Sequence, residues 1–216
     1  MLHAAEPSGS DQRNAPRVAL LMRPAKLIMA SGEFLCVVRD LSETGIRVRL
    51  LHPLAIERRL AVEFQTGTNV EMETMWQRES DVGFRFDLPL DVAKEIESVG
   101  DRPKRAIRLN LRVPLILSAG GHCMNSTLHN LSNHGARIEC GARRLAIGEL
   151  IQIESLGLPS VRGRVRWRRQ DTYGFVFVDT FSLSDLAKYT AALQLDDPAR
   201  SRVPPLDASA SETATG

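Results

Sequence analysis

Hydrophobic and polar residues alternate along many short stretches of this chain. Residues 46–50 are Ile46, Arg47, Val48, Arg49 and Leu50, and residues 161–169 alternate in the same way. A period of two residues is typical of a strand with one buried face. In the second half, strand-like segments separated by Gly, Asn, Ser or Pro cover residues 109–119, 126–132, 135–140, 149–156, 161–169 and 173–179. The pattern therefore predicts a mainly β protein.

The pattern occurs twice. A turn of small polar residues with Asp40, Ser42 and Gly45 precedes the first alternating strand, and Asn130, Ser132 and Gly135 stand in the same places later. We expect the glycine to adopt a positive φ in this turn. Downstream, a tryptophan precedes a glycine by seven positions in both halves, at residues 76 and 83 and at residues 167 and 174. These landmarks keep their spacing to within one residue, which indicates an internal duplication.

Each repeat predicts many short strands followed by a helix. Closure into a barrel is favoured because it leaves no exposed strand edge. Residues 89–100 and 182–195 carry the helical patterns, the second with Ser184 as its expected N-cap. The predicted organisation is a flexible N-terminus at 1–12, domains at 13–100 and 101–195, and a disordered tail at 196–216. The aromatic residues predicted to lie in the barrel cores are Trp76, Phe84, Phe86, Trp167, Phe175 and Phe177.

Composition narrows the class of protein. The 216 residues are 43% hydrophobic and 25% charged, as in ordinary globular proteins. No apolar run reaches the roughly 18–20 residues that span a bilayer. Three cysteines without CxxC spacing favour the reducing cytoplasm. Residues 1–100 have 12 basic and 15 acidic side chains, net −3, whereas the remainder has 16 and 11, net +5.

Basic residues precede each of the two turns. Arg13 and Arg17 are four residues apart, and Arg17 lies 23 residues before Asp40. In the second repeat Arg108 holds the matching place, 22 residues before Asn130, with Lys104 and Arg105 upstream. An RxxxR pair, a [D/N]xSxxG turn, a Trp/Gly/Phe strand pair and a closing helix together resemble the PilZ domain. The resemblance covers roughly residues 13–98 and 102–195.

The resemblance implies two tandem six-stranded PilZ-like β-barrels, each followed by a helix, and a receptor for the bacterial second messenger cyclic di-GMP. Arginine can form paired hydrogen bonds with phosphate or with guanine O6 and N7, and a carboxylate or amide can accept from guanine N1–H and N2–H₂. The glycines would let the ligand approach the backbone, and the serines would bind phosphate or brace the turn. The implied ligand residues are Arg13, Arg17, Asp40, Ser42, Gly45, Lys104, Arg105, Arg108, Asn130, Ser132 and Gly135.

The two repeats do not match this motif equally. The first fits it position for position, whereas the second has Lys104 in place of the first arginine, and lysine cannot form the same two-pronged contact. We therefore expect the first site to bind cyclic di-GMP, and the second to bind more weakly or to serve a structural role. Ligand binding would order the arginine segment and change the contacts of the barrels with each other or with a partner. The family suggests control of motility, biofilm or exopolysaccharide.

Other functions have less support in the sequence. A tandem scaffold that binds only protein is the main alternative. The arginines of residues 161–169 could contact nucleic acid, but a solvated strand face is the favoured interpretation, because exposed aromatic residues to stack on bases are not expected there. The spacings of His122, Cys123, His129, His134 and Cys140 match no zinc motif, and we predict no metal or cofactor. No GxSxG, P-loop or HExxH motif is present, and no enzymatic activity is predicted.

Overall fold

The computed structural model describes residues 18–97, 106–141 and 144–195. The first repeat forms a closed antiparallel barrel with the strand order β1-β2-β3-β6-β5-β4, and the pairing of β1 with β4 completes the closure. Its strands are β1 (Val18–Met29), β2 (Gly32–Ser42), β3 (Gly45–Leu50), β4 (Arg59–Glu63), β5 (Asn69–Arg78) and β6 (Asp81–Phe86). We call this unit barrel 1.

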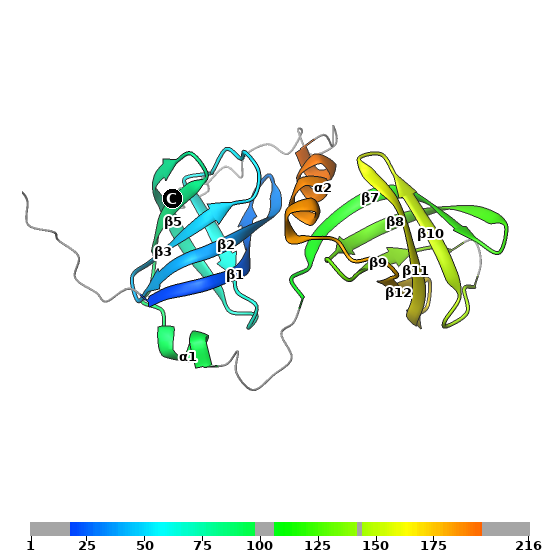
Figure 1. Cartoon of the computed structure of the whole chain (residues 1–216), viewed down its shortest axis with the longest axis horizontal. Helices are drawn as coiled ribbons and strands as arrows, with labels where there is room; N and C mark the ends of the chain where they lie inside the picture. Colours follow the sequence, from blue (N-terminus) through cyan, green and yellow to red (C-terminus); the bar gives the residue numbers. More distant parts are fainter. Residues whose placement is uncertain (1–17, 98–105, 142–143, 196–216) are drawn as a thin grey trace, which may run out of the picture.

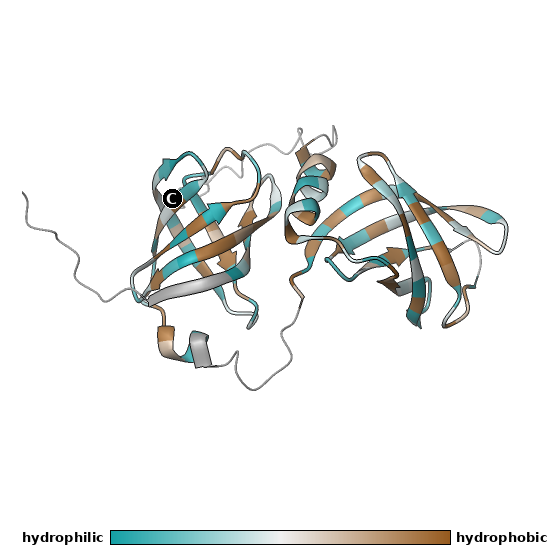
Figure 2. Cartoon of the chain, in the orientation of Figure 1, coloured by the Kyte–Doolittle hydropathy of each residue, from teal (hydrophilic) through white to brown (hydrophobic). Residues whose placement is uncertain are grey.

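The second repeat forms barrel 2, with the equivalent order β7-β8-β9-β12-β11-β10 and with β10 pairing back to β7. Its strands are β7 (Leu109–Ala119), β8 (His122–Leu131), β9 (Gly135–Glu139), β10 (Leu150–Ser155), β11 (Leu158–Arg169) and β12 (Thr172–Phe177). Apolar and polar residues alternate along these strands (Figure 2), so that each barrel encloses its own apolar core. The predicted mainly β fold with two six-stranded barrels is confirmed.

Irregularities in the strand pairing recur at equivalent places in the two barrels. The register of β2 with β3 shifts just before Asp40, and that of β8 with β9 shifts just before Asn130. The pairing of β5 with β6 shifts just before Trp76, and that of β11 with β12 just before Trp167. Each such β-bulge inserts an extra residue and changes which side chains face outward. The duplication therefore includes the local distortions of the sheets.

A helix follows each barrel. The short helix α1 (Val92–Glu97) begins after Asp91, whose carboxylate accepts a hydrogen bond from the Lys94 amide at 3.0 Å. Helix α2 (Leu183–Leu195) begins after Ser182, whose hydroxyl oxygen accepts from the Asp185 amide at 3.1 Å. The expected N-cap at Ser184 is therefore wrong by two residues. Ser182 is preferred because its hydroxyl also donates to the Asp185 carboxylate at 2.7 Å, which adds a second capping contact.

Helix α2 lies between the two barrels (Figure 1). Its Leu186, Ala187 and Leu193 are buried in the core of barrel 2, whereas Ala191 belongs to the core of barrel 1. In the opposite direction, Leu35 of β2 is buried in the core cluster of barrel 2. The helix of the second repeat is therefore shared by both barrels.

The predicted domain limits at residues 13, 100, 101 and 195 stay predictions. The N-terminal segment 1–12 and the tail 196–216, with their predicted flexibility and disorder, lie outside the described residues. None of the helices in the described part of the chain is long and apolar enough to cross a membrane.

Candidate functional site

A cavity of about 370 Å³ opens on the outside of barrel 1, next to the turn between β2 and β3. Asp40, Ser42 and Gly45, which the sequence pattern singles out, all line it. The opposite wall comes from β6, which the strand order places beside β3, and from β5, which lies next to β6. The complete lining is Asp40, Leu41, Ser42, Thr44, Gly45, Ile46, Arg47, Met75, Trp76, Gly83, Phe84 and Arg85. Its volume is within the range of about 300–1,000 Å³ common for small-molecule sites.

The serine of each turn braces the turn itself. The Ser42 hydroxyl oxygen accepts from the Gly45 amide at 3.1 Å and the hydroxyl donates to the Gly45 carbonyl at 3.1 Å. In barrel 2 the Ser132 hydroxyl donates to the Gly135 carbonyl at 3.0 Å. Both serines are buried. The bracing role is thus present without any ligand.

The two turn glycines are required for a reason other than the one expected. Gly45 and Gly135 do not have a positive φ, so that expectation is wrong. Instead, a Cβ at Gly45 would lie 2.4 Å from the Phe84 carbonyl oxygen, and one at Gly135 would lie 2.1 Å from that of Phe175. Adjacent strands approach too closely at these positions for any other residue. The glycines therefore serve the packing of β3 on β6 and of β9 on β12.

The two tryptophans lie on the outer surface of the barrels, and the expectation that they form the core is wrong. Trp76 and Trp167 are each 40% exposed. The β-bulge before each tryptophan turns it outward, where it covers the glycine of the neighbouring strand. A Cβ at Gly83 would lie 2.3 Å from the Trp76 ring, and one at Gly174 would lie 2.0 Å from the Trp167 ring. The other four aromatic residues, Phe84, Phe86, Phe175 and Phe177, are buried as predicted.

Charged side chains form ion pairs at and beside the cavity of barrel 1. Arg47 Nε lies 2.6 Å from Asp40 Oδ2, although the contact is ionic and does not have the geometry of a hydrogen bond. Arg85 donates to Glu73 at 2.7 Å, and Arg58 donates to the same carboxylate at 3.1 Å. Hydrogen bonds from Arg58 and Arg85 hold the pKa of Glu73 below its ordinary value. The cavity thus combines a carboxylate, two guanidinium groups and the face of an indole ring.

The equivalent corner of barrel 2 has unpaired polar atoms. Asn130 is 7% exposed, and its side-chain oxygen is buried without a hydrogen-bond partner among the described residues. Arg137, which pairs with Asn130 across β8 and β9, has its Nε buried and likewise unbonded within the described part of the chain. An unpaired buried polar group costs about 1–3 kcal/mol. This corner is therefore able to accept a polar ligand or water.

The arginine segments are only partly described. Arg13, Arg17, Lys104 and Arg105 lie outside the described residues. Strand β1 begins at Val18, directly after Arg17, and Val18 pairs with Leu41 while Ala19 pairs with Asp40. The main chain that follows Arg17 therefore enters barrel 1 beside the cavity.

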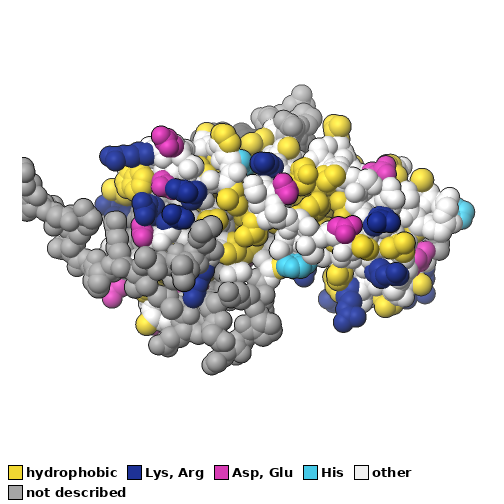
Figure 3. Space-filling view, viewed as in Figure 1, with side chains coloured by type: hydrophobic (Ala, Val, Ile, Leu, Met, Phe, Trp, Pro, Cys, Tyr) yellow, Lys and Arg dark blue, Asp and Glu magenta, His cyan; other side chains and the backbone are white. Residues whose placement is uncertain are grey.

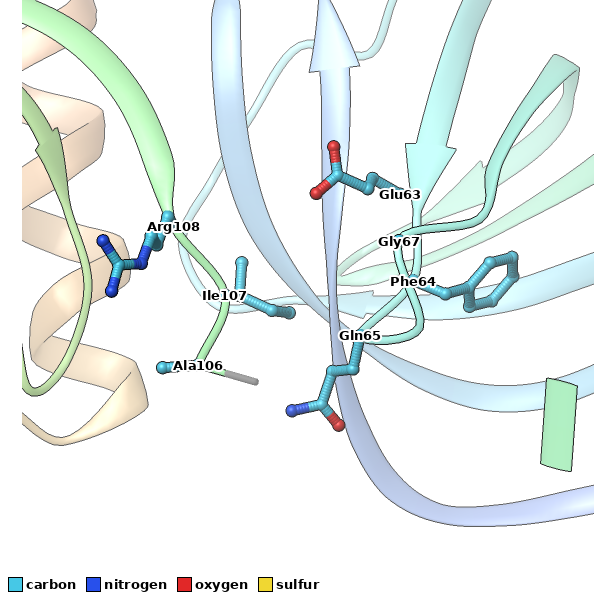
Figure 4. Close-up of a pocket in the computed structure, with 7 residues that line it drawn as sticks. All are labelled: Glu63, Phe64, Gln65, Gly67, Ala106, Ile107 and Arg108. Carbon is cyan, nitrogen blue, oxygen red and sulfur yellow. The ribbon is translucent and has the colours of Figure 1, made fainter. Parts of the chain in front are cut away.

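Arg108 is exposed and precedes β7, whose Leu109 pairs with Leu131. It lines a second cavity of about 450 Å³, between the start of barrel 2 and the β4–β5 region of barrel 1. Figure 4 shows the Arg108 guanidinium pointing away from Glu63, toward α2. The Arg108 carbonyl accepts from Lys26 at 3.4 Å, which ties the backbone of this segment to barrel 1.

Several residues of the cavity were missed from the sequence. Arg47 lies seven positions after Asp40, and Arg137 lies seven after Asn130, so a longer alignment of the two repeats contains a signal for this arginine. Arg85 has no such signal, because barrel 2 has Val176 in its place. Trp76 was recognised as a landmark but placed in the core.

Comparisons with known proteins agree with this description. The PilZ domain profile matches residues 11–99 and 102–193, which together make up most of the chain. The chain belongs to the PilZ domain family. The two separate matches also show that two PilZ domains follow each other in the chain, as expected from the sequence. No curated protein matches the chain.

Three solved structures are similar to this chain at low sequence identity. Escherichia coli YcgR, in complex with c-di-GMP, is 12% identical with a TM-score of 0.33, over 84% of this chain and 87% of that one. PlzA of Borreliella burgdorferi, in complex with c-di-GMP, is 9% identical with a TM-score of 0.33, over 78% and 86%. MrkH of K. pneumonia, in its c-di-GMP complex, is 8% identical with a TM-score of 0.34, over 81% and 87%.

Metal binding has no candidate site in the part of the chain that the structure describes, where no three His, Cys, Asp or Glu side chains come together. The three cysteines are free thiols, of which Cys36 and Cys140 are buried and Cys123 is exposed.

Proposed function

We propose that this protein is a receptor for cyclic di-GMP and has a regulatory, non-catalytic role. The observation that carries the proposal is that Asp40, Ser42 and Gly45 line one open cavity together with Arg47, beside the strand that begins directly after Arg17. Arg13 and Arg17 would complete this site from the preceding segment. In barrel 2, Lys104, Arg105, Arg108, Asn130, Ser132 and Gly135 would form the corresponding and weaker site.

Each group in the cavity of barrel 1 suits one part of the dinucleotide. The Asp40 carboxylate can accept from guanine N1–H and N2–H₂, because its contact with Arg47 uses only part of its acceptor capacity. Guanidinium groups bind phosphate through paired hydrogen bonds. The Trp76 ring is 40% exposed, and the Arg78 guanidinium carbon lies 5.9 Å from its centroid. A guanine that replaces Arg78 could stack on this ring, a contact worth about 1–3 kcal/mol per base in other nucleotide complexes.

Calorimetric titration of the full chain with cyclic di-GMP tests the proposal. We expect binding that Arg17→Ala largely abolishes, and a smaller or separate loss from Arg108→Ala. Arg49→Ala is the matched control, because Arg49 lies on β3 two residues beyond Arg47, is paired with Asp81 at 3.2 Å and does not line the cavity. Absence of both heat and thermal shift at high ligand concentration would contradict the proposal and favour the protein-binding scaffold.

We further propose that the ligand changes how the two barrels meet. Lys26 of barrel 1 is 3% exposed, lies 3.1 Å from both Glu33 and Glu63, and donates to the Arg108 carbonyl. A ligand that draws Arg108 toward the Asn130 corner would alter these contacts. X-ray scattering with and without cyclic di-GMP should show a change in radius of gyration, which Arg108→Ala reduces. Saturating ligand without any change in scattering would contradict this coupling.

A further inference from the structure

Strand β11 presents a row of arginines on the outside of barrel 2. The exposed members are Arg162, Arg164, Arg166, Arg168 and Arg169. Within the described residues, none of these five guanidinium groups forms an ion pair with a carboxylate. Arg164 donates to the Gly148 carbonyl at 3.1 Å. The favoured expectation of an exposed strand face is confirmed, but the charge of this face is not neutralised.

Barrel 1 provides an internal comparison for this face. Glu73 on β5 occupies the position of Arg164, between Arg59 on β4 and Arg85 on β6. The residues beside Arg164 in barrel 2 are Leu150 on β10 and Val176 on β12. In barrel 1 the central residue of this row is a carboxylate paired with an arginine, whereas in barrel 2 it is a cation between two aliphatic residues.

At the next outward-facing position of the strand, a carboxylate in barrel 1 is again replaced by an arginine in barrel 2. Glu71 in barrel 1 corresponds to Arg162 in barrel 2, since the Asp87 amide donates to the Glu71 carbonyl and the Val178 amide donates to the Arg162 carbonyl. Asp87 in turn forms an ion pair with Arg59, whereas Val178 is 51% exposed and uncharged. The same fold therefore accepts carboxylates at both positions. The arginines of β11 are not needed to form the barrel.

The spacing of this row suits a chain of phosphates. Alternate residues of a strand lie about 6.7 Å apart, as Arg162 and Arg164 do. Beyond the β-bulge between Val165 and Trp167 the outer face continues with Trp167 and Arg169, so that the row extends over at most roughly 24 Å. A nucleic acid strand carries one phosphate per about 3.4 Å of its axis, and the row would follow about seven nucleotides. Arginine is well suited to such contacts because its planar group binds phosphate oxygens in pairs.

An exposed aromatic ring lies within the row. Trp167, between Arg166 and Arg168 in the chain, is 40% exposed and covers Gly174. The absence of exposed aromatics was the reason for disfavouring nucleic acid from the sequence, and that reason no longer holds. Over the region of β11 and β12, cationic side chains lie among hydrophobic ones, with a few acidic side chains nearby (Figure 3).

We propose that the outer face of β11 binds the phosphate backbone of a nucleic acid, with Trp167 stacking on a base. Arg162 and Arg164 lie apart from the candidate cyclic di-GMP site of barrel 2, because they correspond to Glu71 and Glu73, which do not line the cavity of barrel 1. Trp167 corresponds to Trp76, which does line that cavity, so the two candidate sites of barrel 2 share this ring.

Fluorescence anisotropy tests the proposal, with the full chain and labelled single-stranded and duplex DNA of about 20 nucleotides per strand at about 50 mM salt. We expect the chain to bind one of these probes, and the double variant Arg162→Glu/Arg164→Glu to bind at least about tenfold more weakly. The variant should also lower the slope of log K against log salt by roughly 1.4–1.8, the contribution of two phosphate contacts. We expect this double variant to fold, because glutamates occupy the two equivalent positions in barrel 1.

The control is Lys94→Glu/Lys188→Glu, which makes the same change in net charge at exposed helix positions away from β11. It should bind within about twofold of the native chain. No binding of either probe, or equal losses in the two double variants, would overturn the proposal. If polyglutamate displaces the DNA as well as unlabelled DNA does at equal charge, the face binds acidic polypeptides and the proposal is wrong.

Discussion

Lys26 Nζ lies 3.1 Å from Glu33 Oε2 at the junction of the two barrels, where the lysine side chain is only 4% exposed. The same glutamate accepts from the amide and the side chain of Asn110, at 2.6 and 2.9 Å. Its backbone amide and carbonyl pair with the Gln194 side chain at 2.8 and 2.7 Å. Glu33 therefore connects barrel 1 with β7 and with α2.

Replacing Glu33 should destabilise the chain. Among the described residues, Glu33→Gln leaves the buried ammonium of Lys26 with one carboxylate, Glu63, and with the Arg108 carbonyl. We expect a loss of about 2–3 kcal/mol in the free energy of unfolding, less than for a fully isolated buried charge. Urea denaturation measures it. Glu71→Gln, at an exposed position of β5, is the control and should change stability by less than about 0.5 kcal/mol. Similar values for the two variants would mean that the Lys26 contact contributes little.

A methyl group at Gly83 should displace the Trp76 ring. The added Cβ would lie 2.3 Å from the ring, so that Gly83→Ala forces the indole away from the sheet. We expect a shift of tryptophan emission and at least about a tenfold loss of cyclic di-GMP affinity, since one stacked base is worth about 1–3 kcal/mol.

The control for this variant is Gly141→Ala, because a Cβ there meets no atom within 4 Å. It should leave both emission and affinity unchanged. Unaltered nucleotide binding by Gly83→Ala, together with a shifted emission, would exclude Trp76 from the site.

Acidification should weaken the fold through His52. Both of its ring nitrogens are buried without a partner in the described part of the chain, and its ring lies 5.8 Å from that of Phe34. Burial lowers the pKa of His52 below its ordinary value of 6.5. The unfolded chain therefore takes up a proton as the pH falls through 6.5 that the folded chain does not bind, and stability falls with pH there, by at most about 1.4 kcal/mol per pH unit.

Thermal unfolding at pH 7.5 and at pH 5.5, values chosen about one unit on each side of the ordinary histidine pKa, measures this loss. His52→Phe should reduce the difference between the two pH values, whereas replacing the exposed His122 with Ala should not. If the native chain and His52→Phe lose the same thermal stability between the two pH values, His52 is not the cause of the loss.

Only one cysteine should react quickly with a thiol reagent in the folded chain. Burial raises the pKa of the Cys36 thiol, which donates to the Ala25 carbonyl at 3.5 Å, and Cys140 is 1% exposed. Cys123 is exposed. Titration with Ellman's reagent should release one equivalent rapidly and all three after denaturation, and Cys123→Ser should lose the rapid phase. Two rapid equivalents in the native chain would show that a barrel core opens.

The barrels were predictable because alternation and repeat spacing are properties of the chain itself. The outward position of Trp76 was not, because a single β-bulge at residues 74–76 reverses the face on which the following residues lie. The sequence also did not show why residue 45 must be glycine. The Phe84 carbonyl that excludes a side chain there belongs to a strand almost forty residues further along the chain. Sequence patterns identify which residues matter in these turns, whereas strand pairing determines what they contact.

The position of α2 makes the two repeats depend on each other unequally. Barrel 1 ends in a helix of six residues and receives Ala191 from the helix of its neighbour. A fragment that stops after residue 97 would lack this apolar cover, and we expect it to aggregate or to unfold at lower temperature. We therefore expect barrel 1 to reach its full stability only when the second repeat is present.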